Sequence, residues 1–469
     1  MAGNSAEKIQ GGLLGWVDAR FPLSQLWNDH LARYYTPKNF NFWYYFGSLA
    51  LLVLVLQIVT GIFLTMFYKP DAELAFASVE YIMRDVEWGW LIRYMHSTGA
   101  SFFFIVVYLH MFRALLYGSY KRPRELIWVF GVLIYVVLMA IAFMGYLLPW
   151  GQMSYWGAQV IVNLFATIPY IGPELVTWIR GDFLISDATL NRFFALHVIA
   201  LPLVLLLLVV AHIIALHEVG SNNPDGVEIK KNKDENGVPV DGIPFHPYYT
   251  VKDLVGVGVF FIAFFAVVFF APEMGGYFLE HANFEPADPL ATPEHIAPVW
   301  YFTSFYTVLR AVPDPFLGVV AMGAAVVILF FVPWLDRNPV KSVRYRSLAH
   351  RINLGVFAVT FIVLGYLGAQ PVTAFFSELG IRLSTMYFLF FWLLWFHSRE
   401  RSAVFSLLSF AVIVALYTVY DLMRVGAANE TLVMGMWLLP TAYLLVTMVV
   451  PVLSRSLGRD RPVPERVTA

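Results

Sequence analysis

The sequence predicts an all-α polytopic membrane protein with about ten transmembrane helices. Hydrophobic residues make up 59% of its 469 residues and charged residues only 13%, a balance typical of chains that cross a bilayer several times. Apolar stretches long enough to span a membrane as helices recur along the chain. Two of them carry two histidines each, His96 and His110 on one, His197 and His212 on the other. We therefore expect a four-helix bundle that holds two stacked bis-histidine sites, with interfacial helices around it.

The apolar stretches give the expected spans in order. They lie at residues 42–66, 90–116, 126–147, 190–217, 253–271, 316–335, 350–368, 383–398, 402–420 and 431–452. Between the third and the fourth, residues 147–181 are too rich in Pro and Gly to span and too apolar for a free loop. We expect this segment to form one or two short helices at the membrane interface.

Positive charge predicts the orientation of the chain and its division into segments. Most of the 31 Lys and Arg residues fall on the side that carries the N-terminus, so the positive-inside rule places both termini in the cytoplasm. The expected segments are an amphipathic cytoplasmic segment (1–40), the four-helix bundle (41–217), a cytoplasmic loop with an insertion (218–252), a C-terminal membrane half (253–400), two additional transmembrane helices (401–453) and a cytoplasmic tail (454–469).

Composition excludes several kinds of redox centre. The chain has no cysteine, which rules out disulfides, iron–sulfur ligation and covalent haem attachment within it. A net charge of −1 without a long basic block does not indicate nucleic-acid binding. Any iron–sulfur centre or c-type haem that works with this chain must sit on a partner.

The intervals between the histidines predict metal sites at two depths. His96 and His110 are 14 residues apart, and His197 and His212 are 15 apart, which is about 21 to 22 Å along an α-helix. An imidazole inside a span is costly unless it is paired or liganded, so hydrogen-bonded bundle histidines and a proton relay in a transporter are alternatives. Histidine pairs without carboxylate or thiolate neighbours fit axial ligation of haem best. With both axial positions filled, such haems would carry electrons.

Glycines repeat this interval on two neighbouring stretches. Gly47 and Gly61 are 14 residues apart on the first span, and Gly131 and Gly145 are 14 apart on the third. Each would let the edge of a flat macrocycle approach the backbone, although ordinary small-residue helix packing gives the same pattern.

Two arginines flank the first histidine pair. Arg93 lies three residues before His96, and Arg113 lies three residues after His110. Their symmetry favours contact with haem propionates at the two membrane faces. Either arginine alone is more typical of a residue that extends its charge to the interface.

Several long motifs indicate a family. WLIRYMHSTGASFFFIVVYLHMFRALLYGSY, AFMGYLLPWGQMSYWGA, RFFALHVIALP, AHIIALHEVGSNNP, FHPYYTVKDL and TPEHIAPVWYF follow one another in this order. Over about residues 20–400 the sequence resembles cytochrome b, the membrane core of the quinol:cytochrome c oxidoreductase (cytochrome bc complex), in its bacterial form. The resemblance implies that quinol is oxidised at an outer site and that one electron crosses the membrane through two b-type haems. That electron would reduce quinone at an inner site, coupled to proton translocation.

The resemblance assigns the four histidines to two non-covalent haems. His96 and His197 would hold the low-potential haem, and His110 and His212 would hold the high-potential haem. Gln57, in the motif QIVTG, would help to hold the outer one.

The resemblance also implies two quinone sites, with ubiquinol and ubiquinone as substrates. The outer site would include Tyr155, Gly157, Pro298, Trp300 and Tyr301. The inner site would include His217, Ser221, Lys252 and Asp253. A histidine near neutral pKa beside a Lys and an Asp can deliver protons to a reduced quinone from the inner side.

The outer loop departs from the family pattern at one position. The family usually reads Pro-Glu-Trp-Tyr, with the glutamate taken as the proton acceptor from quinol, whereas this chain has Val299 after Pro298. Valine cannot accept a proton, so that role does not transfer to position 299. Glu294, five residues earlier, is the nearest carboxylate in the loop, and our hypothesis is that it substitutes; the alternative is a surface carboxylate.

Three further features differ from the usual pattern. The interval of 15 residues on the fourth span predicts a local bulge or tilt near Pro202. Residues 227–242 resemble an insertion, and the two spans after residue 401 exceed the usual eight. We assign no chemistry to these two helices.

The resemblance implies partners and a location. The expected partners are a Rieske-type iron–sulfur subunit, a c-type cytochrome, quinone and membrane lipid, in a homodimeric complex in the bacterial cytoplasmic membrane. A different di-haem quinone enzyme subunit is the closest alternative, but it would lack the GQMSYWGA segment and the TPEHIAPVWY loop.

Overall fold

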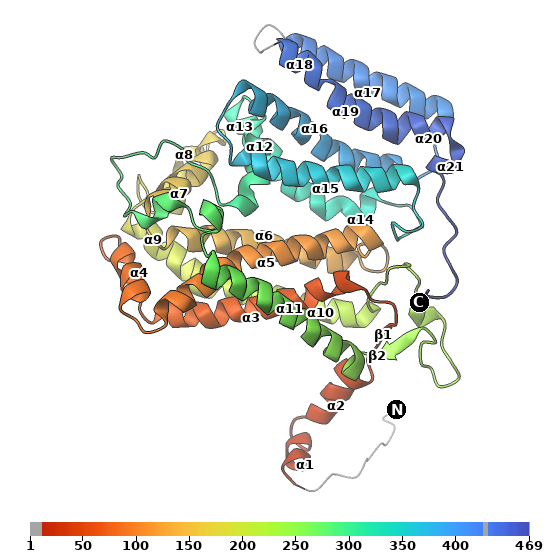
Figure 1. Ribbon diagram of the computed structural model, residues 1–469, viewed down its shortest axis with the longest axis horizontal. Helices are drawn as coiled ribbons and strands as arrows, with labels where there is room; N and C mark the ends of the chain where they lie inside the picture. The colour runs from red at the N-terminus through yellow and green to blue at the C-terminus, as the bar shows by residue number, and fades with distance from the viewer. Residues whose placement is uncertain (1–11, 425–429, 469) are drawn as a thin grey trace.

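The computed structural model describes residues 12–424 and 430–468 of the chain. Within that part the protein is helical, as predicted (Figure 1). A single two-stranded antiparallel sheet pairs β1 (Tyr35–Pro37) with β2 (Gly242–Pro244) in the described residues. The expected segments at 1–40, 401–453 and 454–469 include residues 1–11, 425–429 and 469, which lie outside the described residues, and the segment boundaries stay predictions.

The described residues include ten helices long and apolar enough to cross a membrane, which confirms the expected number. The first four spans contain α3 (Tyr45–Thr65), α5 (Gly89–Tyr117), α6 (Glu125–Leu147), and α9 (Asp187–Ala195) continued by α10 (Leu201–Val219). The fifth span contains α11 (Thr250–Phe270), and the sixth contains α13 (Pro315–Val327) followed by α14 (Val332–Leu335). The seventh, eighth and ninth are α15 (Leu348–Gly368), α16 (Ala374–Phe396) and α17 (Ala403–Arg424). The tenth contains α18 (Glu430–Met436), α19 (Leu438–Leu444) and α20 (Val450–Leu453).

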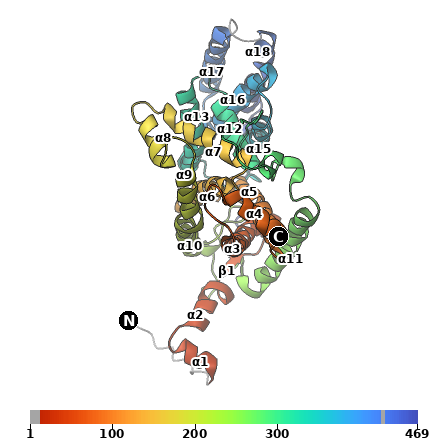
Figure 2. The ribbon, with the colours of Figure 1, turned by 90° about the vertical axis from the view of Figure 1, so that its left-hand side faces the viewer.

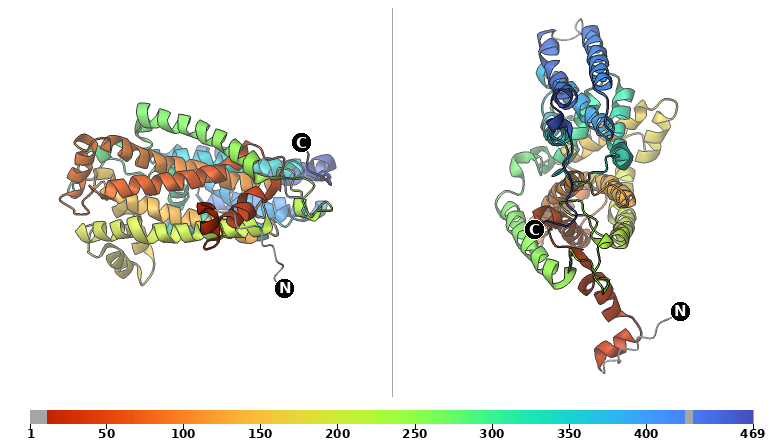
Figure 3. Two further views of the ribbon diagram at one scale, coloured as in Figure 1. Left: turned by 90° about the horizontal axis from the view of Figure 1, so that it is seen from below. Right: turned by 90° about the vertical axis from the view of Figure 1, so that its right-hand side faces the viewer.

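The first four spans form one bundle, and the later spans pack beside it. Within the bundle α3 packs on α5 and α6 packs on α10, while α11 lies along α3 and α5 (Figure 3). The second layer contains α13, α15 and α16 with the short helix α12 (Thr303–Arg310), and α17 with α18 forms the far edge (Figure 2). A continuous apolar core joins both layers through residues such as Phe104, Tyr135 and Phe390.

The wider interval on the fourth span has the expected cause. A π-helical turn, Leu196–Ala200, separates α9 from α10 and ends just before Pro202. A π-turn accommodates one extra residue within a helix. The bulge predicted near Pro202 is therefore confirmed, and it compensates for the interval of 15 residues between His197 and His212.

The eighth span begins nine residues earlier than predicted. We expected residue 383, but α16 starts at Ala374 and includes the charged residues Glu378 and Arg382. Thr373 caps it by accepting a hydrogen bond from the Phe376 N–H at 3.2 Å. The charges stay inside because Arg382 pairs with Glu378 on its own helix and with Asp421 on α17 (Nη1 to Oδ1, 2.7 Å).

Short helices gather at one end of the bundle. Residues 147–181 form α7 (Gln152–Leu164) and α8 (Gly172–Arg180), which confirms the expectation of one or two short helices. In Figure 1 they lie at the left-hand end, with α4 (Ala75–Arg84) and the loop that follows α11.

The opposite end carries the chain's polar connections. The β1–β2 pair and the segment after α21 (Arg455–Gly458) lie there, and the N-terminal helices α1 (Leu13–Asp18) and α2 (Leu23–Trp27) extend below the bundle (Figure 1). The tail binds the loop of residues 218–252. Arg466 donates to Asp241 (Nε to Oδ2, 2.8 Å), and the Thr468 N–H donates to Asp225 at 2.9 Å. These hydrogen bonds and the neighbouring positive groups hold the pKa of both carboxyls below the usual range.

The buried charges between α16 and α17 give a first prediction. Arg382 is fully buried, so Arg382→Met leaves Glu378 and Asp421 to share Arg424 alone. Breaking a buried pair in this way costs about 3–5 kcal/mol. We expect a clear fall in the melting temperature of the purified protein in detergent. Arg399→Met, at an exposed position just after α16, is the matched control, and an equal melting temperature for both variants would contradict the prediction.

Candidate functional site

The four histidines form two facing pairs between α5 and the fourth span, where His197 lies in the π-helical turn Leu196–Ala200 and His212 lies on α10. The ring centroids of His96 and His197 are 6.3 Å apart, and those of His110 and His212 are 6.4 Å apart. Both pairs are near-perpendicular, with interplanar angles of 81° and 64°. The structure therefore brings together the pairs that the sequence intervals predict.

Hydrogen bonds at Nδ1 fix the orientation of three of these rings. His197 and His212 donate from Nδ1 to the backbone oxygens of Ile141 (2.8 Å) and Ile127 (3.0 Å) on α6. His96 donates to Thr60 Oγ1 at 2.9 Å, because that hydroxyl already donates to the Leu56 carbonyl. A ring whose Nδ1 carries the proton offers the lone pair of Nε2 to a metal.

His110 differs from the other three. Arg113 Nη2 lies 3.3 Å from its Nδ1 and the guanidinium also lies over the Tyr44 ring, 4.7 Å from its centroid. A propionate group at this face would compete with the imidazole for Arg113. Arg93, its counterpart at the other depth, lines a cavity beside His96.

Each of the four glycines lies against one histidine. A Cβ atom at Gly47 or Gly61 would lie 3.3 Å from Cε1 of His110 or His96, respectively. A Cβ at Gly145 would lie only 2.3 Å from His197 Cε1, whereas one at Gly131 would lie 3.6 Å from His212 Cε1. In this structure the repeated glycine interval makes room for the imidazole rings themselves.

One cavity connects the outer histidine pair with the outer loop. Its lining includes His96 and His197, and also Tyr146 from α6 and Val299 and Tyr301 from the loop motif. Further lining residues are Gln57, Gly61, Arg93, Gly145, Phe278, Leu279 and Asn283. The structure therefore places the predicted outer metal site and part of the predicted outer quinol site around one continuous space.

The aromatic residues of the motif are held by the first bundle. Tyr301 stacks on Phe104 with ring centroids 4.0 Å apart, and its carbonyl accepts from Tyr108 at 2.7 Å. Trp300 does not line the cavity; its Nε1 donates to Ser101 Oγ at 3.0 Å. Gln57 donates to the His96 carbonyl at 3.1 Å and so supports the backbone beside the outer pair.

Four other predicted residues lie outside the cavity lining. Tyr155 packs against Trp150 in a separate apolar cluster. Gly157 lies behind the cavity wall, since a Cβ there would be 3.7 Å from Tyr146. Pro298 precedes the lining residue Val299, and Glu294 is exposed in the loop.

The residues predicted at the inner site lie on both sides of the N-terminal segment. His217, at the end of α10, stacks on Tyr34 and has its Nδ1 3.3 Å from that of His30. The Ser221 carbonyl faces Arg124. On α11, Lys252 lies over the Tyr248 ring, 4.9 Å from its centroid, and Asp253 has Ser48 as hydrogen-bonding partner. In the described residues, no hydrogen bond or ion pair joins the two groups.

Sequence reasoning missed several residues around the outer cavity. Thr60 orients His96, and Tyr146 donates its hydroxyl proton to Glu280 Oε2 at 2.7 Å. Burial raises the pKa of the Glu280 carboxyl to about 7, against the effect of this hydrogen bond. Tyr146 is within the quoted motif AFMGYLLPWG, but nothing in the sequence connects it to a loop more than a hundred residues later.

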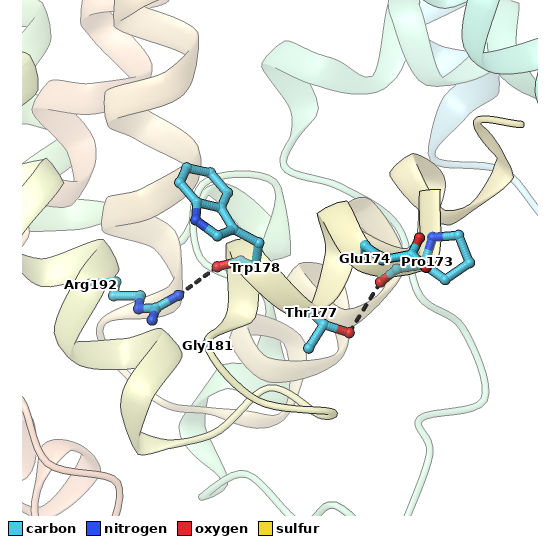
Figure 4. Close-up of a pocket in the computed structure, with 6 residues that line it drawn as sticks. All are labelled: Pro173, Glu174, Thr177, Trp178, Gly181 and Arg192. Atoms are coloured by element: carbon cyan, nitrogen blue, oxygen red, sulfur yellow. Dashed lines mark hydrogen bonds between the residues drawn. The ribbon is translucent and has the colours of Figure 1, made fainter. Parts of the chain in front are cut away.

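A second, shallow pocket lies between α8 and α9 (Figure 4). Arg192 donates to the Trp178 carbonyl and Thr177 to the Pro173 carbonyl at 3.0 Å, both within the pocket wall. None of the four paired histidines lines it.

Comparison with known proteins identifies the family. Residues 31–220 match the family model described as Cytochrome b/b6/petB, and residues 286–389 match Cytochrome b(C-terminal)/b6/petD. The chain belongs to the cytochrome b family. It is 63% identical to a cytochrome b of Allochromatium vinosum over 83% of this chain and 95% of that protein.

Other relatives and a solved structure agree. A cytochrome b of Rhodospirillum rubrum is 50% identical over 81% of this chain and 90% of its own length. A chain of a hyperthermophilic respiratory complex III has a TM-score of 0.76 and 39% identity, and the match covers 82% of this chain and 98% of that one. Membership of the cytochrome b family confirms the fold class and makes this an electron-transport protein of the membrane.

The residues present fit the b-type haem that the family implies. Two imidazoles face each other at each depth, and three of them have the Nδ1 proton engaged so that Nε2 remains for iron. Among the described residues no group of three or more His, Cys, Asp or Glu side chains could hold a metal ion. Each pair would supply two imidazole nitrogens to the iron of one haem, which would act there as a one-electron carrier.

The glycine contacts give a second prediction. Gly145→Ala would place a methyl group 2.3 Å from His197 Cε1 and force the imidazole to move, whereas Gly131→Ala adds an ordinary contact at 3.6 Å to His212. We expect Gly145→Ala to lower the haem content of the purified protein and Gly131→Ala to leave it unchanged, as measured by absorption spectroscopy. Equal haem content in both variants would contradict this.

Proposed function

We propose that this cytochrome b is the di-haem subunit of a respiratory complex III that oxidises quinol at an outer site and reduces quinone at an inner site. The observation that carries the proposal is the single cavity that holds His96 and His197 together with Tyr301 of the outer loop. A quinol bound there would lie directly beside the outer haem position.

The histidine pairs would hold the two haems. His96 and His197 would ligate the low-potential haem, and His110 and His212 the high-potential haem. When bound, the haems would supply one-electron carriers at two depths, about 21 to 22 Å apart along the helices. Gln57 and Thr60 keep the His96 segment in place, and Arg93 and Arg113 lie where propionates would need donors.

The outer site would position quinol through the aromatic residues of the loop. Tyr301 lines the cavity, and Trp300 fixes the loop on α5 through Ser101. Pro298 would shape the turn into this segment, and Tyr155 and Gly157 on α7 would support the wall that Tyr146 forms. Glu294 stays a hypothesis for the proton acceptor.

The inner site would supply protons to reduced quinone. The end of α10, which contains His217 and is followed by Ser221, and the start of α11, which contains Lys252 and Asp253, lie near the end that carries the polar connections (Figure 1). An imidazole and a carboxyl group there can exchange protons with the cytoplasm. His30 adds a second imidazole next to His217.

The partners and location follow from the same proposal. One electron of each quinol would pass to a Rieske-type iron–sulfur subunit and onward to a c-type cytochrome, since this chain has no cysteine. The other would cross the membrane through the haems. We expect a homodimeric complex in the bacterial cytoplasmic membrane, both termini in the cytoplasm, lipid around it, and ubiquinol and ubiquinone as substrates.

The proposal predicts the behaviour of ligand variants. His96→Leu removes one axial ligand of the outer pair, so the purified complex should lose one of two b haems and retain the one with the higher potential in a redox titration. His295→Leu, at an exposed loop position, should keep both haems. A native complex that binds fewer than two b haems, or does not reduce cytochrome c with quinol, would contradict the proposal.

A further inference from the structure

Position 299 leaves the outer cavity without a carboxylate in its usual place. Val299 is 4% exposed and lines the cavity. Quinol oxidation releases protons, so an acceptor must lie within reach of this space. Among the described residues, only the carboxylate of Glu280 is hydrogen-bonded to a side chain of the cavity wall. Its partner is the hydroxyl group of Tyr146.

The geometry of this pair is that of a proton relay. Tyr146 projects from α6 into the cavity wall, and its hydroxyl donates to Glu280 Oε2 at 2.7 Å. Leu279, the residue before Glu280, also lines the cavity. Burial raises the pKa of the Tyr301 phenol, and the negative charge of Glu280 raises it further.

We propose that Glu280 is the residue that takes a proton from quinol at the outer site, reached through the hydroxyl group of Tyr146. This inference rests on the proposed function and assigns the role that Val299 cannot fill. Glu280 comes from the loop between α11 and α12, in the same part of the chain as the motif but before it.

Oxidation of one quinol to quinone releases two electrons and two protons. The quinol hydroxyl gives its proton to the Tyr146 oxygen while Tyr146 gives its own proton to Glu280, so the tyrosine stays neutral and the carboxylate becomes the neutral acid. Under the proposed function, one electron would go to the haem that His96 and His197 would hold, and the other, with the second proton, to the iron–sulfur partner. Glu280 then releases its proton to the outer aqueous side, where the next side chain, His281, is 76% exposed.

The surroundings of Glu280 suit reversible protonation. The titratable groups that face it are the phenols of Tyr146 on α6 and Tyr301 in the motif, and Arg93 on α5 lines the same cavity. In the described part of the chain Glu280 forms no ion pair, whereas His281 pairs with Glu273 away from it. Burial without a cation keeps the pKa of this carboxyl near 7, which is favourable for a base that must also release its proton.

Glu294 lacks these features. It is exposed, does not line the cavity, and has no hydrogen bond to a lining residue in the described structure. The two carboxylates can therefore be distinguished by the pH dependence of quinol oxidation, which should change only in the variant that lacks the proton acceptor.

The test compares quinol oxidation by purified complexes across pH 5.5 to 8.5, an interval of about 1.5 units on either side of the expected pKa. A base acts when deprotonated, so the native rate should fall as pH drops through about 7. Glu280→Gln should lower the rate at pH 7 about 100-fold and remove this pH step. Glu280→Asp should retain part of the quinol oxidation rate and the fall in rate near pH 7. Tyr146→Phe should lower the rate as Glu280→Gln does, although it leaves the carboxylate in place.

The controls separate a proton-accepting role from a structural one. Glu285→Gln changes an exposed carboxylate of the same loop and should match the native complex. Val299→Glu added to Glu280→Gln should restore the rate, because it returns a carboxylate to the cavity wall. Normal b-haem spectra and redox potentials in every variant establish that the fold is intact.

Two outcomes would overturn the inference. One is a Glu280→Gln complex with the native rate and pH profile; the other is loss of the pH step in Glu294→Gln instead. Both leave the proposed function standing, since the native complex still oxidises quinol. A native complex without quinol oxidation would instead contradict the proposed function.

Discussion

The structure depends on holding four imidazoles at two depths between α5 and the fourth span. Each ring faces its partner, with ring centroids 6.3 and 6.4 Å apart, and the rest of the bundle keeps the rings in this arrangement. Glycines on α3 and α6 lie against the rings, where larger side chains would displace them. Carbonyls of α6 and a threonine of α3 fix three of the four Nδ1 atoms. A π-helical turn on the fourth span accommodates the extra residue, so that His197 faces His96 and His212 faces His110.

A second constraint is the cost of charge inside a membrane protein. Around α16 and α17 the chain satisfies it with opposite charges, as in the pairs that Arg382 forms with Glu378 and Asp421. Near the outer cavity it does so differently, because Glu280 is bound by the neutral phenol of Tyr146. A carboxylate paired with a cation stays charged, whereas one held by a phenol can change its protonation state. The first arrangement suits stability and the second suits proton exchange.

Much of this could be predicted from the sequence because it follows from periodicity and length. The ten spans followed from the lengths of the apolar stretches. The histidine pairs and the bulge near Pro202 followed from residue intervals along single helices. The start of α16 could not, because Glu378 and Arg382 look like an interface until α17 supplies their partners. Glu280 was missed for the same reason: its importance depends on Tyr146 from a distant helix, and distance along the chain favoured Glu294 instead.

With Val299 in place of the motif glutamate, the electron path and the proton path from quinol would no longer start at the same segment. The electron path needs a fixed distance from quinol to the outer histidines, so the motif residues Trp300 and Tyr301 stay anchored on α5. The proton path needs only a chain of hydrogen bonds. The carboxylate at the end of that chain can therefore come from a different part of the protein. With an apolar residue at 299 and the carboxylate reached through α6, protons would leave by the loop before the motif, while the electron would go to the haem that His96 and His197 would hold. The pairing of the histidines therefore constrains where electrons go, and it leaves the route of the proton free to vary.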